Sequence, residues 1–177
     1  MQEIKYIKPA ALRKEMTRLR NERKMDFLES LTGMDWGEPT EGDAPDAIRG
    51  LGVVYHLEST TTGERITIKT STLNRENPEI PSVCDLWKAA EMNEREVYDF
   101  FGIVFSGHPD MRRLFLRNDW IGYPLRKDND PEKDNPLCMT NEDTIDTTTE
   151  IELNPDGTIK NKETILFGDE EYVVNIG

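Results

Sequence analysis

Two β-rich runs joined by a short turn place the strongest constraint on how this chain folds. Residues 51–59 (LGVVYHLES) and 65–73 (RITIKTSTL) are rich in residues that favour strands, and the Thr-rich turn between them contains Gly63. Such a pair is typical of a β-hairpin. In the second run Ile66 and Ile68 alternate with polar residues, so one face of the strand should pack inward. The chain is therefore expected to fold around an antiparallel pair with one buried face.

The segments on either side of the hairpin carry helical patterns. Apolar residues recur near helical spacing over residues 9–31, which predicts an amphipathic helix that ends at Gly33. An apolar-periodic run after Ser82 predicts a second helix start, and Asn93 begins a pattern with the character of a capping box. We expect that helical turn to stop at Gly102.

Shorter elements complete the predicted domain. The sequences IVF (residues 103–105) and RRLFL (residues 112–116) are typical of further strands, and the acidic segment 35–46, with two Gly and two Pro, is typical of a solvated loop. Helix, hairpin, helix and more strands favour an α+β fold of two layers, with helices covering one face of a mainly antiparallel sheet.

Charge divides the chain of 177 residues unevenly. The net charge is −13, and residues 130–177 hold 13 acidic and 3 basic side chains, which leaves only −3 for residues 1–129. We therefore predict an α+β domain over residues 1–129 and a long acidic C-terminal extension over residues 130–177, with short β-like fragments at 151–153, 164–167 and 172–176. The acidic balance argues against a general nucleic-acid binder.

Several common sites lack their residues in this sequence. No run of about 20 apolar residues is present, and the first residues lack the apolar stretch of a signal peptide, so we expect a cytoplasmic protein. Cys84 and Cys138 are too few and too far apart for a disulfide framework, a CxxC pair or an iron–sulfur cluster. The GLG at residues 50–52 precedes a strand and lacks the third glycine of a dinucleotide-binding turn.

His108 and Asp110 are the only pair that suggests catalysis. A His beside an Asp can act as an oriented general base, which keeps open a free-standing acid/base enzyme as one interpretation. Pro109 places the two residues in a bend, where His and Asp side chains commonly bond to the backbone. The structural role is the favoured interpretation, because neither a nucleophile nor a metal-ligand spacing accompanies the pair.

The segment from Glu94 to Asp128 combines dense charge with dense apolar content. Arg95 and Asp99 lie four residues apart and can pair on one helical face. Between Met111 and Lys127 the net charge is +4, opposite in sign to the C-terminal extension. The carboxylates of the helix can pair with the arginines that follow, or those arginines can face a partner subunit, where Arg and aromatic residues are enriched. Both interpretations can hold together.

This segment, ERE followed by D and FFGIVFSGHPDMRRLFL and then DWIGYPLRKD, resembles the motif of the 30-kDa subunit, also called the C subunit, of respiratory complex I (NADH-quinone oxidoreductase). The resemblance is strongest over residues 82–128, and the motif is long and mixed enough to make a chance match improbable. The chain departs from the usual pattern at Met92, where the family has Trp, at Tyr123, where it has His, and at residues 129–130, where it has Tyr-Pro.

The resemblance implies a cofactor-free docking subunit without catalytic residues, with iron–sulfur clusters, NADH and quinone held by partner subunits. It implies packing against the 49-kDa subunit (the D subunit) in the peripheral arm, on the cytoplasmic face of a bacterial plasma membrane, in support of electron transfer from NADH to quinone coupled to proton translocation. An equivalent subunit of a membrane-bound hydrogenase or of a ferredoxin- or quinone-linked relative is the alternative. The matching positions are Glu94, Arg95, Glu96, Asp99, Gly102, Gly107, His108, Pro109, Asp110, Arg112, Arg113, Arg126, Lys127 and Asp128.

The charge reversal leads to one hypothesis about how the chain docks. The basic run Arg126–Lys127 and the neighbouring Asp128 are expected to contact the partner subunit, because they lie in the basic segment of an otherwise acidic chain.

Overall fold

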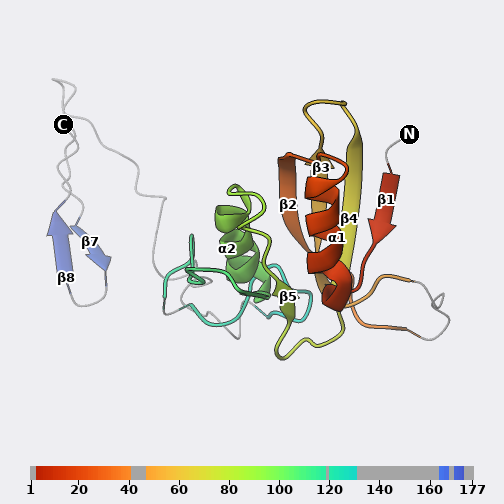
Figure 1. The fold of residues 1–177 in the computed structure, drawn as a ribbon. Coiled ribbons are helices and arrows are strands. Elements are labelled where there is room, and N and C mark those ends of the chain that lie inside the picture. The colour runs from red at the N-terminus through yellow and green to blue at the C-terminus, as the bar shows by residue number, and fades with distance from the viewer. Residues whose placement is uncertain (1–2, 41–46, 119, 131–163, 168–169, 174–177) are drawn as a thin grey trace, which may run out of the picture. The chain divides into compact units, whose positions relative to one another are not determined.

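The structure is a computed structural model that describes residues 3–40, 47–118, 120–130, 164–167 and 170–173, and residues 3–72 contain a four-stranded sheet. The strands β1 (Glu3–Tyr6), β2 (Phe27–Asp35), β3 (Leu51–Glu58) and β4 (Arg65–Thr72) lie in the order β1-β4-β3-β2 (Figure 1). The predicted hairpin is confirmed as β3 and β4. β1 runs parallel to β4, so the sheet is mixed, whereas β2 and β3 pair in antiparallel fashion.

The first helix is shorter than its sequence pattern predicted. α1 (Pro9–Asn21) buries Leu12, Met16 and Leu19, but the chain then turns and residues 27–35 form β2, so the predicted helix over residues 9–31 is wrong beyond Asn21. A register shift between Leu28 and Ser30 puts both Leu28 and Leu31 on the buried face of the strand. A bulge can thus place apolar residues three positions apart on one face of a strand, a spacing that otherwise indicates a helix.

Gly33 lies within β2 and does not end a helix. A Cβ atom at this position would lie 2.4 Å from the ring of Phe101, which belongs to α2 (Ala90–Phe101). The close approach explains why a residue without a side chain stands in the interior of a strand.

The second helix begins at neither predicted start. Ala89 is its N-cap and makes no side-chain capping bond, so the starts predicted at Ser82 and Asn93 are wrong. Its predicted end is confirmed, because Gly102 takes the left-handed conformation with φ 73° and its N–H bonds the Tyr98 carbonyl at 2.8 Å. Before and after α2 the strands β5 (Glu79–Pro81) and β6 (Val104–Ser106) pair in parallel, and β6 corresponds to the strand predicted at residues 103–105.

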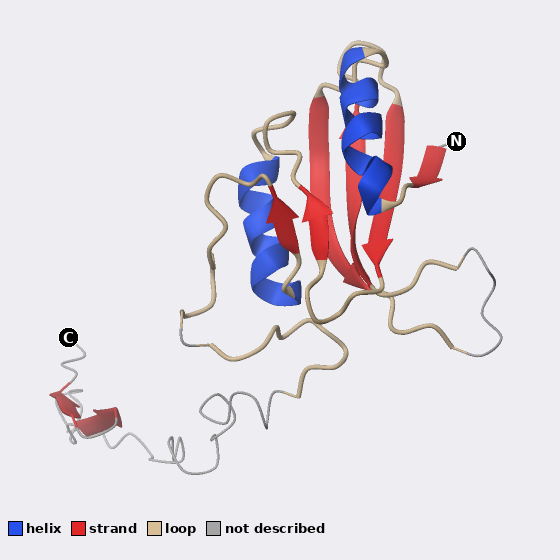
Figure 2. Ribbon diagram, turned by 60° about the horizontal axis from the view of Figure 1, so that its bottom comes forward, coloured by secondary structure: helices blue, strands red, loops and turns tan. Residues whose placement is uncertain are grey.

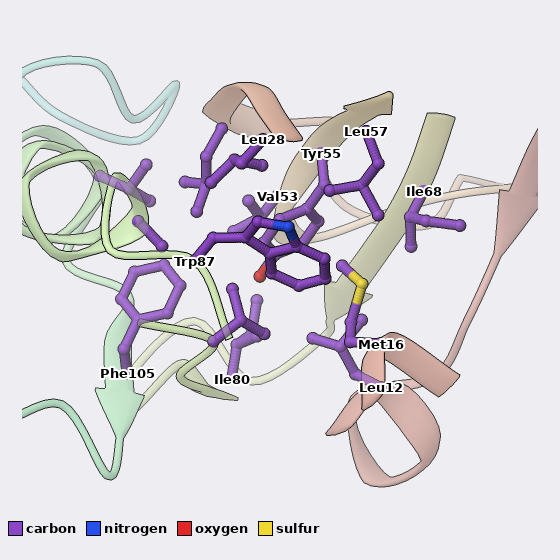
Figure 3. Packing of buried hydrophobic residues seen from close by; sticks show 14 of the residues in the cluster. Leu12, Met16, Leu28, Val53, Tyr55, Leu57, Ile68, Ile80, Trp87 and Phe105 are labelled. Carbon is purple, nitrogen blue, oxygen red and sulfur yellow. The ribbon is translucent and has the colours of Figure 1, made fainter. Parts of the chain in front are cut away.

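Both helices contribute to one hydrophobic core. α1 lies over the sheet (Figure 2), and its buried residues join those of α2 and the inward residues of β2, β3 and β4 in one cluster. The Trp87 ring occupies the middle of this cluster (Figure 3), and its indole N–H donates to the Met25 carbonyl at 3.0 Å. The predicted α+β class is therefore confirmed.

The chain divides into two compact units, Met1–Met139 and Thr140–Gly177. In the second unit β7 (Thr164–Phe167) and β8 (Glu170–Val173) form an antiparallel pair. The fragment predicted at residues 151–153 lies outside the described residues, and the predicted division between residues 129 and 130 stays a prediction. Within the described parts of the chain, no helix is long and apolar enough to cross a bilayer.

Candidate docking site

Residues 107–118 and 120–130 form a long loop without helix or strand, here called the motif loop. Its first anchor is the Asp99 carboxylate, which projects from α2 and is completely buried. One carboxylate oxygen accepts three backbone N–H bonds, at 3.0, 2.7 and 2.9 Å, from Leu114, Phe115 and Leu116. The strand predicted at residues 112–116 is therefore wrong, because its backbone donors bond a carboxylate and not a neighbouring strand.

Hydrogen bonding decides the charge state of Asp99. Burial by itself raises the pKa of this carboxyl, but the backbone N–H bonds and the Arg113 guanidinium together outweigh it and hold the pKa below its usual value. The Arg113 Nη1 atom lies 2.9 Å from the other carboxylate oxygen. Asp99 is therefore a buried anion whose partners are fixed in number and direction.

Arg113 extends this anchor across the loop. Its Nη2 atom donates to the carbonyls of Trp120 and Gly122, both at 3.1 Å, and its guanidinium stacks over the Tyr123 ring at 5.3 Å from the centroid. Tyr123 in turn lies against the end of α2, where a Cβ atom on Gly102 would meet its ring at 2.5 Å. The predicted pairing of a helix carboxylate with a following arginine is thus realised by Asp99 and Arg113.

The second anchor is Asp35, at the end of β2. Its carboxylate accepts two bonds from Arg75, at 3.0 and 2.7 Å, and backbone N–H bonds from Gly37 at 2.8 Å and Lys127 at 2.9 Å. Burial raises the pKa of this carboxyl, but the bonds from Arg75, Lys127 and Gly37 overcome that effect and lower it well below its ordinary value. Asp35 therefore ties the end of the motif loop to the sheet.

Sequence reasoning missed Asp35 and Arg75. Asp35 stands at the start of the segment predicted to be a solvated loop, yet its side chain is only 2% exposed. The sequence does contain a pattern that indicates a buried Asp35. Leu31, Gly33 and Asp35 stand at alternate positions of one strand and therefore lie on the same face. Nothing in the sequence marks Arg75 as the partner of Asp35, since Arg75 lies 40 residues after Asp35 and on the far side of the hairpin.

Arg126 and Asp128 complete the second anchor. Arg126 donates to Asp128 at 3.0 Å and to the Arg75 carbonyl at 2.7 Å, and Arg75 donates to Asp128 at 3.1 Å. The bond from Arg75 is the main reason that the pKa of Asp128 is lowered to about 2, and the bond from Arg126 lowers it further. The guanidinium of Arg126 also lies 5.8 Å from the Tyr123 ring centroid. Arg126 and Asp128 are engaged within the chain, whereas the Lys127 side chain is exposed.

The remaining charged residues of α2 divide between the core and the surface. Glu94 is completely buried, where it accepts bonds from the Ser82 hydroxyl at 2.6 Å and the Val83 N–H at 2.8 Å. Burial raises the pKa of Glu94, and these bonds oppose it only in part. Arg95 donates to two carbonyls of the motif loop, those of residues 112 and 113, and Glu96 is exposed.

The side chains of His108 and Asp110 bond different partners. The His108 Nδ1 atom accepts the Asp110 backbone N–H at 3.0 Å, so Nε2 carries the proton and donates to the Glu91 carbonyl at 3.0 Å. The Asp110 carboxylate instead pairs with Arg112 at 2.8 Å. Both ring nitrogens are occupied by backbone groups, which supports the structural interpretation. Gly107 precedes this bend with φ 87°, and Pro109 lies within it.

Three apolar side chains of the motif loop remain exposed, and we call them the apolar tip: Phe115 at 65%, Ile121 at 62% and Leu125 at 55% exposure. Phe115 stacks on Phe100 of α2 with ring centroids 5.8 Å apart, and the Leu125 N–H donates to the Phe100 carbonyl at 3.1 Å. A fixed loop that exposes a phenylalanine and two aliphatic residues has the chemistry of a protein-binding surface.

Comparison with known proteins shows the family of the chain. Residues 5–135 match the family described as the 30 Kd subunit of respiratory-chain NADH dehydrogenase. The chain belongs to this family. All members of the motif, from Glu94 to Asp128, fall inside the matched range. Among the described residues, His, Cys, Asp and Glu side chains form no group of three or more that could hold a metal ion.

Curated relatives of this chain include C/D subunits and C subunits of NADH-quinone oxidoreductase. A protein of Bacteroides thetaiotaomicron, named as the C/D subunit of NADH-quinone oxidoreductase, is 75% identical over all of this chain, which spans 33% of that relative. A protein of Moorella thermoacetica, named as the C subunit of the same enzyme, is 40% identical over 64% of this chain and 70% of its own length. The chain thus spans about a third of the C/D relatives that it matches.

Solved structures show the same fold. A trypsin-resistant fragment of Nqo5 is 34% identical, with a TM-score of 0.52 over 60% of this chain and 80% of the fragment. A chain of the membrane-bound sulfane sulfur reductase, an archaeal respiratory membrane complex, is 29% identical, with a TM-score of 0.57 over 73% of each chain.

Proposed function

We propose that this chain is a docking subunit of the peripheral arm of NADH-quinone oxidoreductase (complex I), in which it carries out no chemistry of its own. The observation that carries the proposal is the motif loop, which two buried carboxylates hold in place while its apolar tip stays exposed. A surface that is rigid, apolar and bordered by charge is suited to a permanent interface.

The buried carboxylates of the motif, and the Asp35 carboxylate that binds its end, support a structural role. Asp99 and Asp35 are saturated by N–H donors, and Glu94 is bonded to Ser82 and Val83 inside the core. Catalytic acids and bases need a reacting group within hydrogen-bond reach, and these side chains are enclosed by the chain itself. Cofactors of the reaction, namely NADH, iron–sulfur clusters and quinone, would therefore reside in partner subunits.

The proposed partner is the 49-kDa subunit, or D subunit, of the same complex. The C/D names of the most similar relatives support this partner, because in them one polypeptide carries both designations. In this role the chain would help to hold together the path of electrons from NADH through iron–sulfur centres to quinone, coupled to proton translocation. It would reach the cytoplasmic face of the plasma membrane through the complex.

A second candidate is the equivalent subunit of a complex with a different electron donor. The likeness to a chain of the membrane-bound sulfane sulfur reductase supports this second candidate, because the same fold occurs in a respiratory complex of another kind. A hydrogenase-type or ferredoxin-linked complex belongs to this candidate.

A tagged pull-down from gently solubilised membranes of the native source tests both candidates. Mass spectrometry of the co-eluting proteins and a visible spectrum of the eluate are the readouts. Iron–sulfur subunits together with an NADH-binding subunit support complex I, and iron–sulfur subunits with a hydrogenase-type or ferredoxin-binding subunit support the second candidate. Recovery of the chain alone and colourless contradicts both.

A charge reversal tests the basic end of the motif loop in the same assay. Because Arg126 holds Asp128, its substitution would disturb the fold, so Lys127→Glu is the cleaner change at this exposed position. Lys14→Glu on α1 is the matched control, since Lys14 is also exposed. Lower recovery of partner subunits with Lys127→Glu alone supports docking through this end, and equal recovery with both variants contradicts it.

A further inference from the structure

Hydrogen bonds to the backbone hold each part of the motif loop that carries a residue of the apolar tip. The N–H groups of Leu114, Phe115 and Leu116 all bond Asp99, which fixes the chain before, at and after the Phe115 side chain. Exposed loops without such bonds sample many conformations and lose that freedom on binding. Phe115 is therefore presented in one orientation before any partner arrives.

The other two residues of the tip are held in the same way. Arg113 donates to the carbonyls of residues 120 and 122, which flank Ile121 on both sides. The Leu125 N–H bonds the Phe100 carbonyl, and the Phe100 ring stacks on that of Phe115. The hydrogen bonds thus fix the backbone of the loop while three large apolar side chains stay exposed to solvent.

The charges around the tip indicate what kind of surface it meets. Exposed charges of both signs lie along the described part of the motif loop, namely Arg112, Arg117 and Lys127 together with Asp110, Asp128 and Asp130. A partner that complements this region needs an apolar recess with charged side chains of both signs at its border. The overall negative charge opposes adsorption to an anionic membrane, which favours a protein surface over a lipid one.

We propose that Phe115, Ile121 and Leu125 are the anchor residues of the docking site and enter an apolar recess, bordered by charged side chains of both signs, on a partner subunit. This inference rests on the proposed function and goes further, because it separates residues that bind the partner from residues that only position the loop. Asp99, Arg113 and Asp35 belong to the second group. Aromatic and aliphatic anchors of this kind carry most of the affinity in protein interfaces.

A pair of isoleucines provides the matched test. Ile121 and Ile4 are 62% and 63% exposed, and Ile4 lies on β1 at the edge of the sheet, away from the motif. The tagged full-length chain is prepared as Ile121→Ser, Ile4→Ser and Phe115→Ser, and the iron–sulfur subunits recovered from solubilised native membranes are quantified per mole of chain. We expect recovery at limiting chain to fall at least about tenfold for Ile121→Ser and Phe115→Ser and to stay unchanged for Ile4→Ser.

Circular dichroism of each purified variant checks the fold, since all three positions are exposed and their substitution should leave it intact. If the wild-type chain recovers iron–sulfur subunits and the tip variants recover them equally well, the anchor assignment is overturned while the proposed function stands. If the wild-type chain recovers none, the proposed function itself fails and the anchor assignment fails with it.

A photo-crosslink identifies the occupant directly. Phe115 is replaced by a benzophenone-bearing phenylalanine in the tagged chain, and adducts are mapped by mass spectrometry after irradiation of the membranes. An adduct with a partner-subunit peptide that contains apolar residues next to charged ones supports the proposal. An adduct with a second copy of this chain overturns it, as does binding of the purified chain to phosphatidylglycerol vesicles that Ile121→Ser abolishes.

Discussion

Neutralising the buried Asp99 carboxylate should unfold the motif loop first and weaken the whole domain. In Asp99→Asn the side chain keeps its size, but the amide replaces the anion that accepts three backbone N–H bonds and one bond from Arg113. Breaking a buried ion pair from one side costs about 3–5 kcal/mol, and total stabilities of domains are about 5–15 kcal/mol. We expect the free energy of unfolding to fall by about 3 kcal/mol, at the lower end of that range, because the amide oxygen retains part of the acceptor capacity.

Urea unfolding followed by tryptophan fluorescence measures this loss. Trp87 is buried in the core and reports global unfolding, and a loss of about 3 kcal/mol lowers the urea midpoint by about 1–3 M. Asp110→Asn is the matched control in the same loop, since Asp110 also pairs with an arginine but both side chains are exposed. Its midpoint should stay close to that of the wild type. Equal midpoints for the two variants would refute the anchoring role of Asp99.

The pH dependence gives an independent check of the same carboxylate. The folded state lowers the pKa of Asp99, so its contribution to stability is present above about pH 4 and is lost as the pH falls through the folded pKa. The difference in the free energy of unfolding between the wild type and Asp99→Asn should therefore shrink as the pH falls below about 4. A difference that grows towards low pH would contradict the assignment.

Other contacts lead to three further predictions. Gly33→Ala should destabilise the domain by roughly 1–3 kcal/mol, because the new Cβ meets the Phe101 ring, and Phe101→Leu should restore part of the loss in the urea midpoint. Asp35→Asn should release the end of the motif loop, so that trypsin cleaves the native chain after Arg126 at least about tenfold faster; an unchanged rate would contradict the second anchor. Burial raises the pKa of Glu94, so the folded state retains a proton that the unfolded chain releases, and stability should fall as the pH rises above about 4.5. Glu94→Gln should remove that dependence in urea titrations between about pH 5 and 8, and an unchanged slope would speak against it.

The sequence predicted those parts of the fold that short-range patterns encode. The hairpin of β3 and β4 and the end of α2 at Gly102 follow from runs of residues that favour strands and from a glycine that tolerates positive φ. The helix predicted over residues 9–31 failed where a strand bulge brings Leu28 and Leu31 to one face. Spacing alone does not distinguish these two cases, because both place apolar residues three positions apart.

The charged residues of the motif were named from the sequence, but neither Asp35 and Arg75 nor the apolar tip was included. The motif residues were found by resemblance, yet the distinction between positioning residues such as Asp99 and exposed residues such as Phe115 needed coordinates. Asp35 and Arg75 lay outside the motif, and their contact joins segments 40 residues apart. Carboxylates that bind backbone N–H groups leave no residue-type pattern at the bound positions, since any residue except proline supplies the donor.

Hydrogen exchange of the isolated chain tests most directly whether the motif loop is fixed before a partner binds. The three amides that bond Asp99, those of Leu114, Phe115 and Leu116, should exchange at least about a hundredfold more slowly than in an unstructured peptide. In Asp99→Asn this protection should be lost, while the amides of β3 keep theirs. Exchange of these three amides at unstructured rates in the free wild-type chain, with protection only in the assembled complex, would contradict the account.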